Sequence, residues 1–240
     1  MDNLKIASRK SDLAMVQTRY VQSMIGGEIV GVSSYGDQNL TAPLYEMKGI
    51  GVFVKMLEVE LLESRAQVAV HSLKDMPTNT QEGLSIAAVP KFNVPRGDVA
   101  VFREGTSNLE DLPEGSKIGT SSLRRSRLIA CAFPHKNFEF SNIRGNLNTR
   151  VRKLENGDYD CILLAAAGIH RLNWHETLNM QYLDEEEFLY APGQAALAIQ
   201  CREDNLVLRG FLSSFEDYET RQRVEAERKF MQDLEGVRFT

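Results

Sequence analysis

Short apolar segments alternate along this chain with segments whose apolar residues recur at helical spacing, and this alternation constrains the fold most. The clearest apolar segment is Cys161–Ala165, and Gln67–His71 and Leu84–Val89 are further examples. Parallel strands joined by helices produce such a pattern because both faces of the sheet are buried. The sequence therefore predicts an α/β protein with mixed, mostly parallel sheets that are covered by helices.

Residue type and spacing predict the other elements. Further strands are expected at residues 4–7, 29–34, 117–119, 138–143 and 197–200. Helices are expected at residues 11–24, 51–62, 121–132, 149–154 and 219–234. Pro90, Pro95 and Gly97 interrupt the pattern, which predicts a boundary between two units near residues 91–98. The segment 190–200 is expected to return the chain to the first unit.

The charge of the chain is unevenly distributed. The 240 residues carry a net charge of -5, which argues against a general nucleic-acid binder. Residues 119–153 nevertheless hold eight basic residues and a single acid, Glu139, for a local charge of +7. This concentration indicates a pocket for a small polyanion, and a solvated basic helix face is the alternative.

No segment of the sequence predicts export or membrane insertion. The longest apolar run, Cys161–Ile169, has nine residues, whereas a membrane-spanning helix needs about 20. The first five residues lack the apolar stretch of a signal peptide. Three cysteines lie far apart and form no C-x-x-C pair. We expect a reduced, cytoplasmic monomer without a membrane partner, a nucleic-acid partner or a structural zinc.

Two predicted strand ends carry motifs typical of anion binding. The first is Gly119-Thr120-Ser121-Ser122-Leu123-Arg124-Arg125, and the second is Arg144-Gly145-Asn146-Leu147-Asn148-Thr149-Arg150. Amide groups at a helix start, hydroxyls and arginines all suit carboxylate or phosphate. Arg9 ends the first strand and adds another cation. We expect a rim of guanidinium groups drawn from both units, with an ordinary helix cap and scattered surface charge as the alternative.

A third motif, Val70-His71-Ser72-Leu73-Lys74-Asp75-Met76-Pro77, closes a buried strand. An aspartate at such a strand end, within an arginine-lined cleft, can stabilise a developing cation or hold a ring N–H. We expect His71 to be structural. His170 and His175 are five residues apart and lack a third ligand, so no metal site is predicted.

Together these motifs resemble the hydroxymethylbilane synthase family, also called porphobilinogen deaminase. The resemblance covers essentially the whole chain, and the motifs follow in the family's order and spacing. Besides the three motifs above, it is carried by Arg9-Lys10-Ser11, Gly36-Asp37, Phe53-Val54-Lys55, Ala191-Pro192-Gly193-Gln194 and Ala226-Glu227-Arg228.

The resemblance implies a transferase of haem biosynthesis that condenses four porphobilinogen molecules, with loss of ammonia, into a linear tetrapyrrole. It implies a dipyrromethane cofactor on which the chain grows, and the acetate and propionate of each pyrrole fit an arginine-rich cleft. Asp75 is implied to be catalytic, holding pyrrole N–H groups and stabilising the cationic azafulvene. The residues implied to bind substrate or cofactor are Arg9, Ser11, Lys55, Ser72, Lys74, Thr120, Ser121, Ser122, Arg124, Arg125, Arg144, Gly145, Arg150, Arg171 and Gln194.

The resemblance also implies the domain organisation. The family has two periplasmic-binding-protein-like lobes and a third, smaller domain. On this chain the first lobe corresponds to residues 1–93 and 191–211, and the second lobe to residues 98–190. Residues 217–240 correspond to a remnant helix of the third domain.

The sequence departs from the family's pattern at its end. Family members read Leu-Glu-Gly-Gly-Cys there, and that cysteine attaches the cofactor, whereas this chain reads Leu234-Glu235-Gly236-Val237-Arg238-Phe239-Thr240. Arg238 cannot form the thioether, and the chain's own cysteines lie on other elements. Covalent attachment is therefore not expected. We expect the rest of the third domain to be absent and the last helix to expose Val224, Phe230 and Met231.

Two smaller departures concern loops. Ile50 stands where a lid, predicted at residues 43–53, often has lysine in the family, and Ala195 stands where glycine follows the glutamine. The departures leave two alternatives to an active synthase. One is a non-catalytic two-lobed binder of pyrroles or small polycarboxylates, and the other is a truncated product of low stability.

Overall fold

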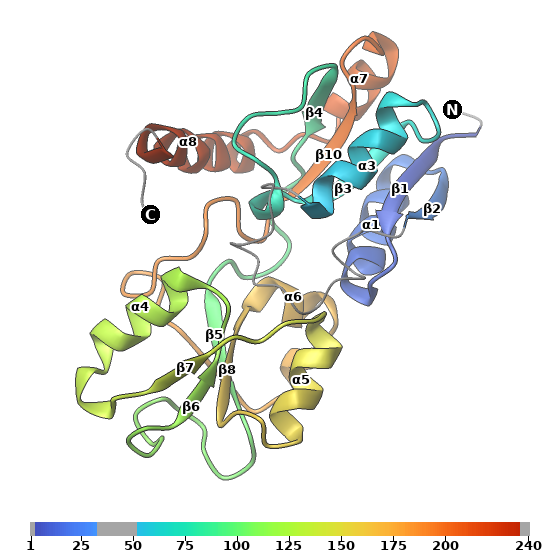
Figure 1. The fold of residues 1–240 in the computed structure, drawn as a ribbon. Coiled ribbons are helices and arrows are strands. Elements are labelled where there is room, and N and C mark those ends of the chain that lie inside the picture. The colour runs from blue at the N-terminus through green and yellow to red at the C-terminus, as the bar shows by residue number, and fades with distance from the viewer. Residues whose placement is uncertain (1–2, 33–51, 236–240) are drawn as a thin grey trace. The chain divides into compact units, whose positions relative to one another are not determined.

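The computed structural model describes residues 3–32 and 52–235, which form two compact units. Unit 1 comprises residues 3–32, 52–93 and 191–235, and unit 2 comprises residues 94–190. Each unit is built on one five-stranded sheet (Figure 1). The predicted lid, apart from its last two residues, and the position of Arg238 lie outside the described residues.

The sheet of unit 1 has the strand order β2-β1-β3-β10-β4. The strand β1 runs parallel to β2 and β3, whereas β10 runs antiparallel to β3 and β4. The bounds are β1 (Lys5–Arg9), β2 (Glu28–Val32), β3 (Val68–Ser72), β4 (Leu84–Ala88) and β10 (Leu197–Arg202). The predicted strands are confirmed to within a few residues.

Helices cover both faces of this sheet. The helices α1 (Asp12–Ile25) and α7 (Leu206–Ser213) pack on one face, and α3 (Val52–Leu62) packs on the other (Figure 1). Alternation along β3 explains the two cores, because Val68 and Val70 join the α1 side whereas Ala69 joins the α3 side.

The last helix of unit 1, α8 (Tyr218–Glu235), differs in part from expectation. Phe230 is exposed as expected, but Met231 is half-buried and Val224 is buried with 1% of its surface accessible. Val224 packs in one cluster with Leu73 and Met76. The apolar face of α8 therefore does find a partner, namely the segment that follows β3.

The sheet of unit 2 has the order β7-β6-β8-β5-β9. The strand β6 runs parallel to β7 and β8, and β5 runs antiparallel to β8 and β9. The bounds are β5 (Asp98–Phe102), β6 (Lys117–Gly119), β7 (Glu139–Ser141), β8 (Cys161–Ala165) and β9 (Met180–Tyr182). The predicted strand at 161–165 is confirmed, whereas β5 and β9 were not predicted.

The helices of unit 2 are α4 (Leu123–Ala132), α5 (Leu147–Glu155) and α6 (Ala166–Arg171). The continuously apolar β8 separates two cores, because Ile162 and Leu164 face one cluster whereas Cys161 and Leu163 face the other. Helix α4 begins two residues later than predicted because Ser122, not an earlier residue, is its N-cap. The short α6 and α7 were not predicted.

Both sheets are mixed, and in each of them two pairings of the described strands are parallel and two are antiparallel. The sheets are therefore mixed as predicted, but the prediction that most of their pairings are parallel is wrong. In unit 1 the cause is β10, which enters the sheet between β3 and β4 in the opposite direction. In unit 2 the corresponding strand is β5, which lies between β8 and β9. This strand was not predicted because it directly follows Pro95 and Gly97, which mark the predicted boundary between the units.

Candidate active site

One edge of the sheet in unit 1 gathers the segments that carry its predicted site residues. The strands β1 and β3 are parallel neighbours, so their carboxyl ends lie at the same edge. Ser72, the last residue of β3, pairs with Leu197, the first residue of the antiparallel β10. The loop 191–196 therefore meets the turn after β3, and the amide of Leu73 donates a hydrogen bond to the Ala196 carbonyl at 3.0 Å.

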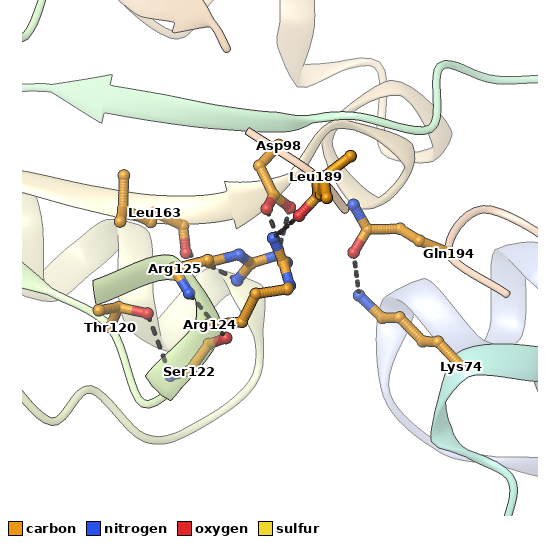
Figure 2. Close-up of polar contacts among 9 residues, drawn as sticks. All are labelled: Lys74, Asp98, Thr120, Ser122, Arg124, Arg125, Leu163, Leu189 and Gln194. Atoms are coloured by element: carbon orange, nitrogen blue, oxygen red, sulfur yellow. Dashed lines mark hydrogen bonds and ion pairs between the residues drawn. The ribbon is translucent and has the colours of Figure 1, made fainter. Parts of the chain in front are cut away.

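The turn after β3 is a short 3-10 helix, Leu73–Asp75, and it presents two charged side chains. Lys74 and Asp75 are both exposed. Lys74 Nζ donates to Gln194 Oε1 at 3.3 Å, and Gln194 is almost fully buried (Figure 2). The Asp75 carboxylate forms no hydrogen bond or ion pair with another residue of the described chain.

Other predicted residues of unit 1 surround this edge. Arg9 ends β1 and is half-buried. Ser11 precedes α1 as its N-cap residue, but its side chain makes no capping hydrogen bond. Ser72 Oγ accepts a hydrogen bond at 2.9 Å from Gln17 Nε2, which reaches it from α1. Lys55 is exposed on α3, and its neighbour Val54 packs in one cluster with Leu73 and Met76, which follow β3.

The loop before β10 contains a residue in an unfavourable backbone conformation. Ala195 has φ +71, in the left-handed region that favours glycine. Gly193 shares that region with φ +71, and a Cβ there would lie 3.2 Å from Leu73 Cγ. The loop thus packs closely on the turn that carries Asp75.

His71 belongs to the interior of unit 1. It is buried on β3, and its Nε2 lies 2.9 Å from Gln200 Oε1. Gln200 Nε2 in turn donates to Glu58 Oε1 at 3.1 Å. Burial lowers the pKa of His71 to about 4, with the Gln200 hydrogen bond opposing this shift. This geometry agrees with the predicted structural role of His71.

In unit 2, two loops at the carboxyl edge of the sheet are tied together. The strands β6 and β7 are parallel, with Gly119 opposite Ser141, so the loops that follow them begin side by side. Ser121 Oγ donates to the Ile143 carbonyl at 2.8 Å, and it lies 3.2 Å from the Ile143 amide, which donates to it. Thr120 Oγ1 accepts from the amide of Ser122 at 3.1 Å. The predicted hydroxyl residues thereby fix the shape of this edge.

The two arginines at the start of α4 share one carboxylate. Arg124 Nη2 lies 2.7 Å from Asp98 Oδ2, and Arg125 Nη2 lies 2.7 Å from Asp98 Oδ1 (Figure 2). Each arginine also donates to a backbone carbonyl, Arg124 to Leu189 and Arg125 to Leu163. Burial lowers the pKa of Arg124, and the nearby Asp98 opposes this shift.

Asp98 was not among the predicted site residues. Its side chain has only 1% of its surface accessible, at the first position of β5 and opposite Ala165 of β8. The alternative of an ordinary helix cap with scattered surface charge does not describe this pair, because Arg125 is 10% and Arg124 25% exposed. The sequence feature that could have pointed to Asp98 is the apolar Val-Ala-Val-Phe segment of β5, which directly follows this aspartate.

The second anion motif forms a compact loop before α5. Gly145 has φ +108, and a Cβ there would lie 2.7 Å from Thr149 Cγ2, so a glycine is needed. Asn146 caps the helix by accepting from the Thr149 amide at 2.9 Å. Arg150 Nε donates to the Gly145 carbonyl at 2.9 Å. Arg144 and Arg150 are both half-buried.

The structure places most of the predicted residues at the carboxyl edges of the two sheets, each within its own unit. Arg171 is different, because it lies in the last turn of α6 and not at a strand end. The residues at the edge of unit 1 are Arg9, Ser11, Ser72, Lys74, Asp75 and Gln194, and those at the edge of unit 2 are Thr120, Ser121, Ser122, Arg124, Arg125, Arg144, Gly145 and Arg150.

The three cysteines are free. Cys161 and Cys201 are buried in the two sheets, and burial raises the pKa of both thiols, that of Cys201 to about 11. A thiol reacts as its thiolate, so both are poor nucleophiles. Cys131 is exposed on α4.

The described ranges, 3–32 and 52–235, contain neither a candidate metal cluster nor a helix suited to cross a membrane. No group of three or more His, Cys, Asp or Glu side chains there could hold a metal ion. His170 and His175 stack on each other with 4.1 Å between ring centroids.

None of the helices in these ranges has both the length and the apolar composition that crossing a membrane requires.

Comparison with solved structures identifies the fold class. A lipoprotein from Bacillus subtilis subsp. subtilis str. 168, assigned to methionine binding, is similar with a TM-score of 0.50 over 92% of each chain. Its sequence is only 14% identical, so the likeness concerns the fold alone. The chain has the α/β fold of two-lobed periplasmic-binding-protein-like proteins, as predicted.

Sequence comparison identifies the family. The family model described as "Porphobilinogen deaminase, dipyromethane cofactor binding domain" matches residues 4–209. Porphobilinogen deaminase of Prochlorococcus marinus subsp. pastoris is 42% identical over 97% of this chain and 75% of its own length. That of Geobacillus kaustophilus is 43% identical over 98% of this chain and 77% of its own length. The chain belongs to the porphobilinogen deaminase family.

This membership confirms the predicted function and the predicted cofactor. The family is one of enzymes of tetrapyrrole synthesis, so the synthase interpretation is confirmed and a non-catalytic binder is not favoured. The matched domain is the one that binds the dipyrromethane cofactor, which confirms the cofactor.

Proposed function

We propose that Asp75 is the catalytic carboxylate of a porphobilinogen condensation. The observation that carries this proposal is the contrast between Asp75 and its neighbour. Lys74 is hydrogen bonded to Gln194, whereas Asp75 is exposed on the same turn with no partner among the described residues. Its carboxylate is therefore available to a bound ligand at the carboxyl edge of the sheet, where α/β proteins bind ligands.

The chemistry of the condensation suits a carboxylate at this place. The carbon–nitrogen bond of the aminomethyl group breaks, ammonia leaves, and a positive charge develops on the pyrrole. A fixed carboxylate stabilises that charge more than it stabilises the neutral substrate, which lowers the barrier. The new carbon–carbon bond then forms and the attacked pyrrole carbon loses its proton.

The donor set around the two edges fits acidic pyrroles and the dipyrromethane cofactor. Carboxylates are recognised by guanidinium, ammonium and hydroxyl groups, and the residues that we propose for this role carry these groups or, for Gln194 and Gly145, an amide. When bound, the dipyrromethane supplies the pyrrole carbon that the first new bond joins. In unit 1 the proposed binding residues are Arg9, Ser11, Lys55, Ser72, Lys74 and Gln194. In unit 2 they are Thr120, Ser121, Ser122, Arg124, Arg144, Gly145, Arg150 and Arg171, and Arg125 supports Arg124.

Arg124 and Arg125 take different parts in this proposal. Arg125 is buried, and both of its terminal nitrogens are used by Asp98 and the Leu163 carbonyl. It therefore acts through Arg124, by holding Asp98 and the start of α4 in place. Arg124 is a quarter exposed and presents the rest of its guanidinium to a ligand carboxylate.

The test compares turnover of porphobilinogen by the full chain, Asp75→Asn and Glu82→Gln, which removes an exposed carboxylate elsewhere in unit 1. Tetrapyrrole formation is followed by absorbance. We expect Asp75→Asn to lose turnover by about a hundredfold or more and to retain part of its dipyrrole binding, with Glu82→Gln unchanged. Unchanged turnover in Asp75→Asn would remove Asp75 from the mechanism.

The mode of cofactor attachment needs a separate measurement. We propose that the dipyrromethane is held noncovalently, since two of the three cysteines are buried with raised thiol pKa values. The intact mass of protein incubated with porphobilinogen should equal the sequence mass under denaturing conditions. An added dipyrrole mass would refute this, and peptide mapping would then locate the attachment residue.

We also propose a cytoplasmic monomer whose only small-molecule partner is porphobilinogen with its products. The three free cysteines suit a reducing compartment, and a net charge of -5 disfavours a nucleic-acid partner. Light scattering after gel filtration tests the monomer, and a mass of twice 27.0 kDa would contradict it.

A further inference from the structure

Two consecutive residues of α8 contact the backbone on both sides of the turn that carries Asp75. Arg228 Nη2 donates to the carbonyls of Pro77 at 2.6 Å and Thr78 at 2.8 Å, and its Nη1 lies 3.5 Å from the Met76 carbonyl, to which it donates. These three carbonyls follow Asp75 directly in the chain. A charged donor bridging three carbonyls fixes the path of that segment.

Glu227 contacts the other side. Its Oε2 accepts a hydrogen bond at 2.8 Å from the amide of Gly193, which precedes Gln194. Gln194 is the residue that holds Lys74. Glu227 thus fixes the loop on which the charged neighbour of Asp75 depends.

An apolar contact completes this arrangement one helical turn earlier. Val224 lies three and four residues before Glu227 and Arg228, so all three occupy one face of α8. Val224 packs with Leu73 and Met76, the residues that begin and follow the turn. A hollow of about 360 Å³, lined in part by Thr78, Val224 and Arg228, lies beside these contacts. The segment 76–78 is therefore held to α8 by a few contacts and not by continuous packing.

We infer that Arg228 and Glu227 are positioning residues for Asp75 and Lys74. This inference rests on the proposed role of Asp75. A shift of about 1 Å in a catalytic group can lower a rate about a hundredfold, and the turn is a 3-10 helix of three residues, closed by the hydrogen bond from the Met76 amide to the Leu73 carbonyl at 3.1 Å. The contacts from α8 supply the rigidity that so short a turn lacks.

Hydrogen exchange tests the inference without requiring turnover. Arg228→Met is compared with Arg223→Met, which removes the same charge from an exposed position on the same helix. We expect peptide amides of residues 73–79 to exchange about tenfold faster in Arg228→Met, as the loss of charged hydrogen bonds implies, and peptides of β1 to be unchanged. Equal exchange in both variants, or faster exchange throughout unit 1, would overturn the inference.

Kinetics with porphobilinogen separates positioning from a general structural role. We expect Arg228→Met to lower kcat about tenfold or more with KM within about threefold, and Arg228→Lys to recover part of the loss. Asp75→Asn is measured in parallel. Full turnover in Asp75→Asn refutes the proposed function, whereas loss in Asp75→Asn with wild-type kcat in Arg228→Met refutes the positioning role alone.

Discussion

Replacing Asp98 with alanine should destabilise unit 2 by about 3–5 kcal/mol. The Asp98 side chain is 1% exposed and accepts two hydrogen bonds of 2.7 Å from Arg124 and Arg125. Without it, two partly or fully buried guanidinium groups lose their counter-charge. Breaking a buried ion pair on one side costs about 3–5 kcal/mol because a desolvated charge is left uncompensated.

The assay uses the single tryptophan, Trp174, which packs against a core of unit 2. Its fluorescence in urea reports the unfolding of the unit that contains Asp98. With an m-value of about 2 kcal/mol/M, the midpoint of Asp98→Ala should fall by about 2 M. The loss should be present at neutral pH and persist in high salt, because buried pairs are screened little.

An exposed ion pair of the same length provides the control. Arg103 Nη2 lies 2.7 Å from Asp160 Oδ1 in unit 2, with the two side chains 47% and 37% exposed. Arg103→Ala should cost less than about 1 kcal/mol, because water and salt screen this pair. If Asp98→Ala and Arg103→Ala shift the midpoint equally, the argument from burial is refuted.

Two further predictions concern a glycine and a histidine. Gly145→Ala should destabilise unit 2 by more than Gly105→Ala in the Trp174 assay. Both glycines have positive φ, which alone costs alanine about 1–2 kcal/mol, but only Gly145 has a side chain, that of Thr149, within 4 Å of the added Cβ. Equal effects of the two substitutions would contradict the argument from this contact. His71 has a folded pKa of about 4, below its unfolded value of about 6.5, so its contribution to stability is complete above pH 6.5 and is lost as pH falls toward 4. We expect the free energy of unfolding to fall by about 2 kcal/mol between pH 7.5 and 5 because of His71, as measured by circular dichroism in urea at each pH. If this free energy changes with pH by the same amount in His71→Gln, the prediction for His71 is contradicted.

Local residue patterns predicted those strands and helices whose residues all indicate the same element. The strand at Cys161–Ala165 was predictable because it is apolar on both faces, as a central strand must be. Strand β5 was missed because Pro95 and Gly97 mark a chain crossing directly before it. Its antiparallel direction depends on where the chain re-enters the sheet, and no local residue pattern encodes that direction.

The placement of the candidate site residues was predictable wherever these residues are contiguous in the sequence. The motif at Gly119–Arg125 indicated hydroxyls and arginines at a helix start, and the structure places them there. Asp98 was missed because it lies 26 residues before Arg124 and reaches it only after β5 and β8 pair. A lone aspartate in a sequence carries no signal of the partners that folding will give it.

The position of Asp98 changes what the basic segment 119–153 can do. Counted along the sequence, the segment carries a charge of +7, which suggests a broad positive field. In the fold, Asp98 offsets Arg124 and Arg125, and Lys136 lies 3.9 Å from Glu110. We therefore expect the attraction for an acidic pyrrole to be carried by a few directed groups and not by the whole segment. Because directed hydrogen bonds to a carboxylate are screened less than a diffuse field, substrate affinity should depend more on Arg144 and the exposed part of Arg124 than on net charge.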